Sequence, residues 1–231
     1  MSRIFITGDT HRNIDIEKLS ERNWPEQKEL TKDDYLIIAG DFGMIWDPEP
    51  TEQERDDLKE LSDRSFTTLF VDGNHENHAR LNEMPQIEKF GGTVGWIAPS
   101  IMHLKRGQVY TINGMKFFTM GGAESIDKYR RIRDISWWPG ELPTTAEMLN
   151  AMLNLDNHNW EVEYVITHTA PLHVIKAMDM HDSKIKDPMA VFLEEMKLKL
   201  KFKEWFFGHM HQEWDSADSK FHGLYNRILE I

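Results

Sequence analysis

The chain has 231 residues, 40% hydrophobic and 29% charged, a composition typical of a globular protein with a sizeable core. It contains no cysteine, which excludes disulfides, thiolate metal ligands and a cysteine nucleophile. The formal net charge of -12 argues against passive attraction to nucleic acid or to an anionic membrane.

Hydrophobic runs in the sequence are short. None reaches membrane-spanning length, and the apolar stretch at the N-terminus is too short for the core of a signal peptide. We therefore expect a cytoplasmic protein that does not bind a membrane. No linker or tandem repeat interrupts the chain, which predicts a single domain over residues 1–231.

The first third of the chain repeats a short apolar run, a turn with Gly and Asp or Asn, and a polar segment of helical character. The runs are RIFIT at 3–7, YLIIA at 35–39 and TTLFV at 67–71. Such strands, alternating with helices, predict βαβ units and a parallel sheet. Thr51 and Glu54 have the form of a capping box, so we expect a helix to begin there.

The middle and the end of the chain predict a mixed architecture. Asn113-Gly114 separates two alternating runs, which is a strong signal for an antiparallel hairpin. Residues 125–143 are basic and aromatic and contain two prolines, so we expect a long loop. Beyond it, the pattern predicts helices from Thr144 to about 157 and from Pro188 to about 201, strands in EYVITH and EWFF, and closing strands in FHGLY and RILEI.

Metal-type side chains follow five of the apolar runs. In open α/β sheets ligands bind at the carboxyl ends of strands, so we expect these five turns to form one site. Each turn alone is weak evidence, because an Asp-x-His after a strand more often serves the geometry of the turn. The residues are Asp9, His11, Asp41, Asn74, His75, His168, His209 and His211.

The types of donor narrow the choice of metal. Oxygen and imidazole donors without sulfur favour manganese, iron or zinc, and their number exceeds what one tetrahedral zinc ion needs. Two ions that share Asp41 are the economical arrangement. A pair of metals about 3.5 to 4 Å apart is suited to in-line displacement at phosphorus.

The ordered motifs GDTH, GDFG, GNHE, THT and GHMH resemble those of the calcineurin-like metallophosphoesterase superfamily, and they extend from residue 8 to residue 211. The resemblance implies an α/β fold of the metallophosphoesterase type, a four-layer sandwich in which two facing mixed β-sheets are flanked by α-helices. It implies that one metal is held by Asp9, His11, Asp41 and His211, and the other by Asp41, Asn74, His168 and His209. It also implies attack on phosphorus by a metal-bridging hydroxide.

In the family, the histidine at the position of His75 is not a metal ligand. It contacts the phosphate and assists the departure of the alkoxide, so the resemblance implies that His75 is catalytic together with Asp41. In the protein-phosphatase branch the second motif continues Gly-Asp-x-x-Asp-Arg, in which the aspartate orients this histidine and the arginine binds phosphate. Met44 and Ile45 stand at those positions here, which disfavours a serine/threonine protein phosphatase and leaves His75 without an evident orienting partner.

Three arginines are candidate substrate-binding residues. Arg12 follows His11 and would supply the missing phosphate contact, with a solvated loop arginine as the alternative. Arg130 and Arg131 lie in the long loop near Arg133, Trp137 and Trp138, a combination suited to binding phosphate and stacking on a base or sugar. The alternative is that the tryptophans pack beneath the loop and the arginines pair with acidic groups. His78 and His103 match no motif and are interpreted as packing or surface residues.

The sequence thus predicts a dinuclear metal-dependent phosphoesterase that hydrolyses a phosphodiester or a small nucleotide-like phosphoester. Its cofactors would be two divalent or trivalent ions, manganese or iron or both, with zinc as an alternative. A nuclease acting on DNA or RNA is the second hypothesis, which the acidic charge disfavours. A phosphoprotein phosphatase and a metal-binding scaffold without activity are less favoured, the scaffold because every ligand position is filled.

Overall fold

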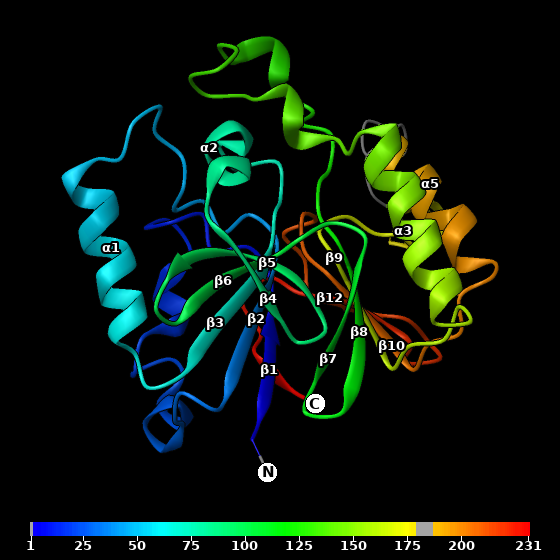
Figure 1. Ribbon diagram of the computed structural model, residues 1–231, viewed down its shortest axis with the longest axis horizontal. Helices are drawn as coiled ribbons and strands as arrows, with labels where there is room; N and C mark the ends of the chain where they lie inside the picture. Colours follow the sequence, from blue (N-terminus) through cyan, green and yellow to red (C-terminus); the bar gives the residue numbers. More distant parts are fainter. Residues whose placement is uncertain (1, 179–186) are drawn as a thin grey trace.

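The computed structural model describes residues 2–178 and 187–231 (Figure 1). Two mixed sheets face each other. The first contains, in spatial order, β13 (Leu229–Glu230), β1 (Ile4–Thr7), β2 (Tyr35–Ala39), β3 (Thr67–Val71), β6 (Ile101–Leu104), β5 (Gly92–Ala98) and β4 (Gln86–Lys89). The second contains β11 (Trp214–Asp215), β12 (Phe221–Gly223), β10 (Glu204–Phe207), β9 (Tyr164–Thr167), β8 (Met115–Met120) and β7 (Gln108–Ile112).

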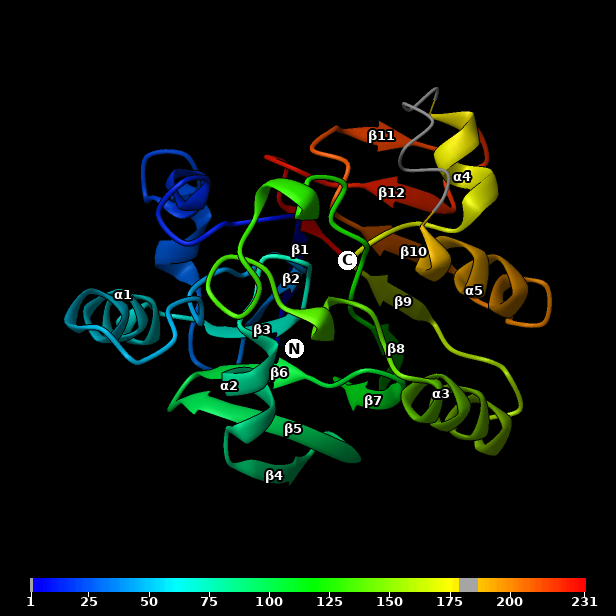
Figure 2. The same cartoon turned by 90° about the horizontal axis from the view of Figure 1, so that it is seen from above.

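Helices cover the outer faces of both sheets (Figure 2). One outer layer contains α1 (Glu52–Asp63), and the opposite layer contains α3 (Thr145–Asn157), α4 (Leu172–Ala177) and α5 (Pro188–Lys197). The short helix α2 (His78–Glu83) lies above the first sheet, after the turn that follows β3. This arrangement confirms the predicted four-layer sandwich.

Three apolar clusters hold these layers together. Between the sheets, side chains of both pack against one another, among them Leu69 and Phe206. Beneath α1 the core includes Leu61 and Phe70, and beneath α3 to α5 it includes Leu193 together with many others. Because both faces of each sheet are covered, the parallel strands are buried along nearly their whole length, which explains why their sequences are mostly apolar, with threonine as the polar residue.

Two helices and one hairpin begin or turn where the sequence predicts, and local hydrogen bonds or backbone angles account for each. The Thr144 side chain accepts from the Glu147 N–H while the Glu147 side chain accepts from the Thr144 N–H, a complete capping box. Thr51 caps α1 by accepting from the Glu54 N–H, but the Glu54 carboxylate pairs with Arg80. In the hairpin between β7 and β8, Asn113 and Gly114 both have positive φ, 52° and 80°, as a two-residue turn of this type requires.

Two expectations about helices are wrong. The polar segment between β1 and β2 forms only short 3-10 turns at Ile16–Leu19 and Pro25–Glu29 in place of a helix. The helix that begins at Pro188 ends at Lys197, about a turn earlier than expected. The chain leaves this helix because Lys201 forms a bridge with Glu161, and its N–H donates to the carbonyl of Trp160 at 2.8 Å.

No helix in the part of the chain that the structure describes is long and apolar enough to cross a membrane.

A buried ion pair joins the turn after β3 to the base of the long loop. The carboxylate of Asp72 accepts from Arg106 Nε at 2.8 Å and from His103 Nε2 at 3.0 Å. Arg106 also donates to the carbonyls of Gly140 and Glu141, at 2.8 and 3.2 Å. Burial alone would raise the pKa of Asp72, but Arg106 and the neighbouring histidines hold that pKa well below its usual range. Asp72 is therefore a buried carboxylate whose charge depends on Arg106.

Replacing Arg106 with methionine is expected to lower the free energy of unfolding by about 3–5 kcal/mol, because the charge of Asp72 would stay buried without its main partner. Urea denaturation of the variant checks this. Replacing Arg55, exposed on α1, with methionine is the matched control and should change the free energy by less than about 0.5 kcal/mol. Equal losses in the two variants would contradict the importance of the ion pair.

Candidate metal centre

The predicted ligands from five turns converge on Asp41. Three groups of side chains each place their donor atoms within 4.8 Å of one another: Asp9, Asp41 and His211; Asp41, His168 and His209; and His11, Asp41 and His75. Asp41 belongs to all three groups. The first two groups are each part of one ligand set that the family resemblance implies.

Direct contacts show how tightly the cluster is packed. His11 Nε2 lies 3.0 Å from Asp41 Oδ2, and His168 Nε2 lies 3.2 Å from Asp41 Oδ1. The side-chain oxygen of Asn74 lies 3.1 Å from His168 Nε2. The backbone N–H of His209 donates to both carboxylate oxygens of Asp9, at 3.0 and 3.1 Å. All the predicted ligands therefore belong to one cluster.

In two of the histidines, Nδ1 lies within hydrogen-bonding distance of an oxygen acceptor. His11 Nδ1 lies 2.7 Å from the carboxylate of Asp15, and His168 Nδ1 lies 3.0 Å from the carbonyl of Ala39. When Nδ1 carries the hydrogen, the lone pair of Nε2 points into the cluster, which is the tautomer that a metal ligand needs. The donor set thus fits hard or borderline divalent ions.

The backbone at the cluster is strained. His11, Asp41, His209 and His211 have φ values of 41°, 47°, 62° and 49°, a left-handed conformation that costs a side-chain-bearing residue about 1–3 kcal/mol. Gly73 lies against the carboxylate of Asp41 and has to be a glycine, because a Cβ at this position would lie 2.0 Å from Asp41 Oδ1. The fold accepts these costs at the site where side chains must converge on one point.

The charged side chains of the cluster shift one another's pKa. Burial raises the pKa of Asp9, and the nearby carboxylate of Asp41 adds to the rise. Burial would also raise the pKa of Asp41, but His168, His75 and His11 outweigh it and hold that pKa well below its usual range. Burial would lower the pKa of His168, whereas Asp41 and Asp9 raise it to about 9. Two buried carboxylates so close together call for compensating positive charge, which bound cations would supply.

His75 lies at the rim of the cluster. Its backbone N–H donates to Asp41 Oδ1 at 2.7 Å, and its ring meets the ring of His11 edge-on, with 4.9 Å between centroids. Arg131 Nη2 donates to His75 Nε2 at 3.1 Å. Burial, together with the positive charge of Arg131, lowers the pKa of His75 to about 4. The ring is therefore neutral near pH 7, with Nε2 as an acceptor.

The long loop passes over this rim. An open pocket of about 260 Å³ is lined by cluster residues and by Ile126, Asp127 and Arg131 of the loop. Arg130 does not line this pocket and is exposed, with its guanidinium 5.2 Å from the ring centre of Tyr129. Trp138 is 3% exposed and packs beneath the loop, so it is not free to stack on a ligand. Tyr129 of the loop is an outward aromatic residue, 75% exposed, which sequence reasoning did not predict.

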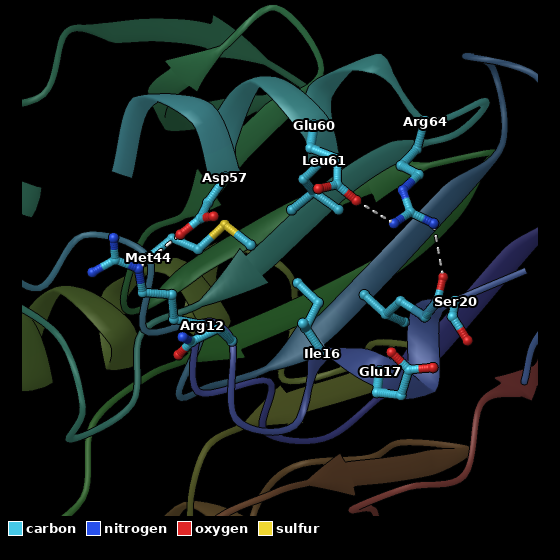
Figure 3. Close-up of a pocket in the computed structure, with 11 residues that line it drawn as sticks. Arg12, Ile16, Glu17, Ser20, Met44, Asp57, Glu60, Leu61 and Arg64 are labelled. Carbon is cyan, nitrogen blue, oxygen red and sulfur yellow. Dashed lines mark hydrogen bonds and ion pairs between the residues drawn. The ribbon is translucent and has the colours of Figure 1, made fainter. Parts of the chain in front are cut away.

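Arg12 is placed apart from the other predicted residues. Its guanidinium donates to Asp57 at 2.8 Å and to Asp47 at 3.1 Å. It lines a separate cavity of about 130 Å³ beside α1, where Figure 3 shows it next to Asp57 and Met44. The guanidinium is thus already neutralised by two carboxylates, which is a physical reason for it to be a poor phosphate ligand.

Several supporting residues were missed by sequence reasoning. Tyr225 stacks on His211 with 4.8 Å between ring centroids, and its hydroxyl donates to Asp15 at 2.9 Å. Lys18 is buried and donates to the carbonyls of Gly8 and Asp9. Glu76 accepts from the backbone N–H of Phe42, directly after Asp41, at 2.8 Å. Only the position of Asp15, four residues after His11 next to a predicted metal turn, could have suggested such a role.

Comparison with known proteins places the chain in a family. The family model described as calcineurin-like phosphoesterase matches residues 2–213. Among curated proteins, the lariat debranching enzyme of Schizosaccharomyces pombe is 25% identical over 220 residues, 82% of this chain and 45% of that protein. Lariat debranching enzyme A of Xenopus laevis is 24% identical over 245 residues, 90% of this chain and 42% of that protein. The chain spans less than half the length of these relatives.

A solved structure, phosphopantetheinyl hydrolase from Mycobacterium tuberculosis, aligns over 100% of this chain and 95% of that one, with a TM-score of 0.44 and 17% identity. The match of the family model over nearly the whole chain, with the converging Asp, Asn and His side chains, carries the assignment. The chain belongs to the calcineurin-like phosphoesterase family.

Proposed function

We propose that this chain is a dinuclear metal-dependent phosphoesterase that hydrolyses a phosphodiester. The observation that carries the proposal is the position of Asp41, a buried carboxylate common to three groups of potential metal ligands. Asp9, His11, Asp41 and His211 would hold one ion, and Asp41, Asn74, His168 and His209 the other. Such ions, when bound, activate water and stabilise the leaving oxygen in a displacement at phosphorus.

The protein's own groups would bind and orient the phosphate. Arg131 lies at the mouth of the pocket beside His75, where it can reach an anionic oxygen with charge-assisted hydrogen bonds. Transfer of the Arg131 contact from His75 Nε2 to the substrate would free that nitrogen. A phosphate beside the ring favours its protonated form, in which Nε2–H can donate to the departing oxygen.

A phosphodiester with nucleotide character is the preferred substrate class. Four basic residues lie between positions 128 and 133, and Tyr129 next to Arg130 offers an exposed ring to a base. A second candidate, a nuclease acting on branched RNA, is favoured by the name of the curated relatives, lariat debranching enzyme. Manganese or iron as the native metals, with zinc as the alternative, and a cytoplasmic location remain predictions from the sequence.

Purified protein supplied with manganese tests the proposal. We expect turnover of a bis-aryl phosphodiester that exceeds turnover of an aryl monophosphate. Cleavage of an oligonucleotide at a branch, with an unbranched oligonucleotide left intact, would support the branched-RNA candidate. The proposed activity would be contradicted if none of these substrates were hydrolysed when manganese, iron and zinc were each supplied in excess.

Replacing Arg131 with alanine is expected to raise KM for the diester about 10- to 100-fold, the equivalent of one charge-assisted hydrogen bond of about 1.5–3 kcal/mol. Replacing Arg12 with alanine should change KM less than about 3-fold, because Asp47 and Asp57 already occupy its guanidinium. Initial-rate kinetics of both variants distinguish the two arginines. A larger rise in KM for the Arg12 variant would reverse the assignment.

A further inference from the structure

Among the described residues, no carboxylate forms a hydrogen bond with the ring of His75, although an Asp41 oxygen lies within 4.8 Å of one of its nitrogens. Within residues 2–178 and 187–231, His75 forms hydrogen bonds with the Arg131 guanidinium at Nε2 and, through its backbone N–H, with Asp41. Met44 and Ile45, at the positions where an orienting aspartate and an arginine were sought, are 2% and 0% exposed and pack into the core beneath α1. Neither side chain is available to the imidazole.

The next residue along the chain lies against the ring. Trp46 stacks on His75 with 5.6 Å between ring centroids and 21° between the planes. Trp138, from the base of the long loop, stands edge-on against Trp46 at 4.9 Å and 80°. The indole is thus enclosed by His75 on one side and by a buried tryptophan on another, an offset and edge-to-face arrangement that aromatic rings prefer.

The backbone around Trp46 is fixed to the same turn that carries His75. The carbonyl of Ile45 accepts from the Asn77 N–H at 2.8 Å. The carbonyl of Asp47 accepts from the Asn77 side chain at 3.1 Å and from Arg80 Nη1 at 2.7 Å. Because the residues on both sides of Trp46 are bonded to positions just after His75, the indole cannot shift along the imidazole without breaking these bonds.

We infer that Trp46 is the positioning residue of His75 and that its indole fixes the plane of the imidazole, in place of the orienting aspartate of the protein-phosphatase branch. Stacking restricts rotation of the ring but forms no hydrogen bond to either nitrogen. Nε2 therefore stays directed at Arg131 and the pocket. The expected effect of Trp46 on catalysis rests on the proposed function, whereas the stacking of Trp46 on His75 does not depend on it.

The test uses the 231-residue chain and four variants: Trp46→Leu, Trp46→Phe, His75→Ala, and the double variant Trp46→Leu with His75→Ala. We expect Trp46→Leu to lower kcat for the diester about 10- to 100-fold, the effect of a misplaced catalytic group, with KM and bound metal unchanged. Trp46→Phe, which keeps an aromatic face, should stay within about 3-fold of the parent. In the His75→Ala background the Trp46→Leu change should have no further effect, within about 2-fold.

A control variant separates positioning from general loss of packing. Trp96, half-buried on β5, is also replaced by leucine and should leave kcat unchanged. The inference would be overturned if Trp46→Leu lowered kcat by the same factor in the parent protein and in the His75→Ala variant. It would also be overturned if Trp46→Leu left kcat unchanged in the parent protein.

A spectroscopic readout makes the test independent of turnover. In protein supplied with zinc, which is diamagnetic, the imidazole C–H signals of His75 should be shifted upfield by the ring current of Trp46. His75→Ala identifies these signals by their loss. They should move toward the position of an unstacked histidine in Trp46→Leu and stay shifted in Trp46→Phe. If the parent protein hydrolyses no diester but shows these shifts, the proposed function fails and the positioning holds; unshifted signals in the parent would overturn the positioning.

Discussion

Replacing Asp41 with asparagine is expected to abolish most of the diester hydrolysis, a fall in kcat/KM of about 10³-fold or more. The amide keeps the shape of the side chain but removes the negative charge that three groups of ligands have in common. Stabilisation of transition-state charge by metal ions amounts to several kcal/mol, and each 1.4 kcal/mol corresponds to a factor of ten. Initial rates with manganese, together with the metal content of the purified variant, check the prediction.

A control for this variant is Asp63→Asn at the end of α1, an exposed carboxylate paired with Lys59. It should leave both the rate and the metal content unchanged. If Asp41→Asn kept two ions and a rate close to that of the parent protein, Asp41 would not be the shared ligand and the proposed centre would be wrong.

Replacing His75 with alanine is expected to lower kcat about 10²- to 10⁴-fold, the usual contribution of a positioned proton donor. Metal content should stay the same, because none of the seven proposed ligands is changed. Steady-state kinetics and elemental analysis measure the two quantities on the same sample.

The His75 prediction separates catalysis from metal binding. Loss of an ion in His75→Ala would show that the imidazole is a ligand, as its distance from His11 and Asp41 would permit. Full activity with both ions present would exclude a role for the ring in the reaction. His158→Ala, which removes a histidine outside the metal centre at the end of α3, is the matched control.

The convergence of the five turns that carry the candidate ligands could be predicted from the sequence because of a simple property of parallel sheets. Their strands are short and mostly apolar, so the boundaries of each strand can be recognised in the sequence, and their carboxyl ends meet at one edge of the sheet. The polar residue after each strand is then placed in the same region without knowledge of side-chain contacts. The hairpin at Asn113-Gly114 was predictable for a similar reason, since its turn requires positive φ at both residues.

The neighbours of His75 could not be predicted in this way. Arg131 lies 56 positions from His75 along the chain, in a loop without periodicity, and its contact depends on the course of that loop. Trp46 reads in the sequence as another apolar residue after Met44 and Ile45; that it turns out of the core and onto the imidazole depends on the hydrogen bonds of Asn77 and Arg80.

Arg12 is a residue for which the sequence suggested a role that its contacts in the structure do not favour. Its position directly after a metal ligand suggested a phosphate contact, but its partners Asp47 and Asp57 are 35 and 45 positions away. Asp72 likewise has the appearance of a turn residue, whereas the fold buries it against Arg106 and His103. Pairings of this kind are decided by tertiary structure alone.

The most direct test of the account is the number of ions bound by the protein in solution. After incubation with excess manganese and removal of free metal, elemental analysis should find two ions per chain, and at most one in Asp41→Asn. One ion or none in the parent protein, under conditions that saturate the site, would contradict a dinuclear centre bridged by Asp41.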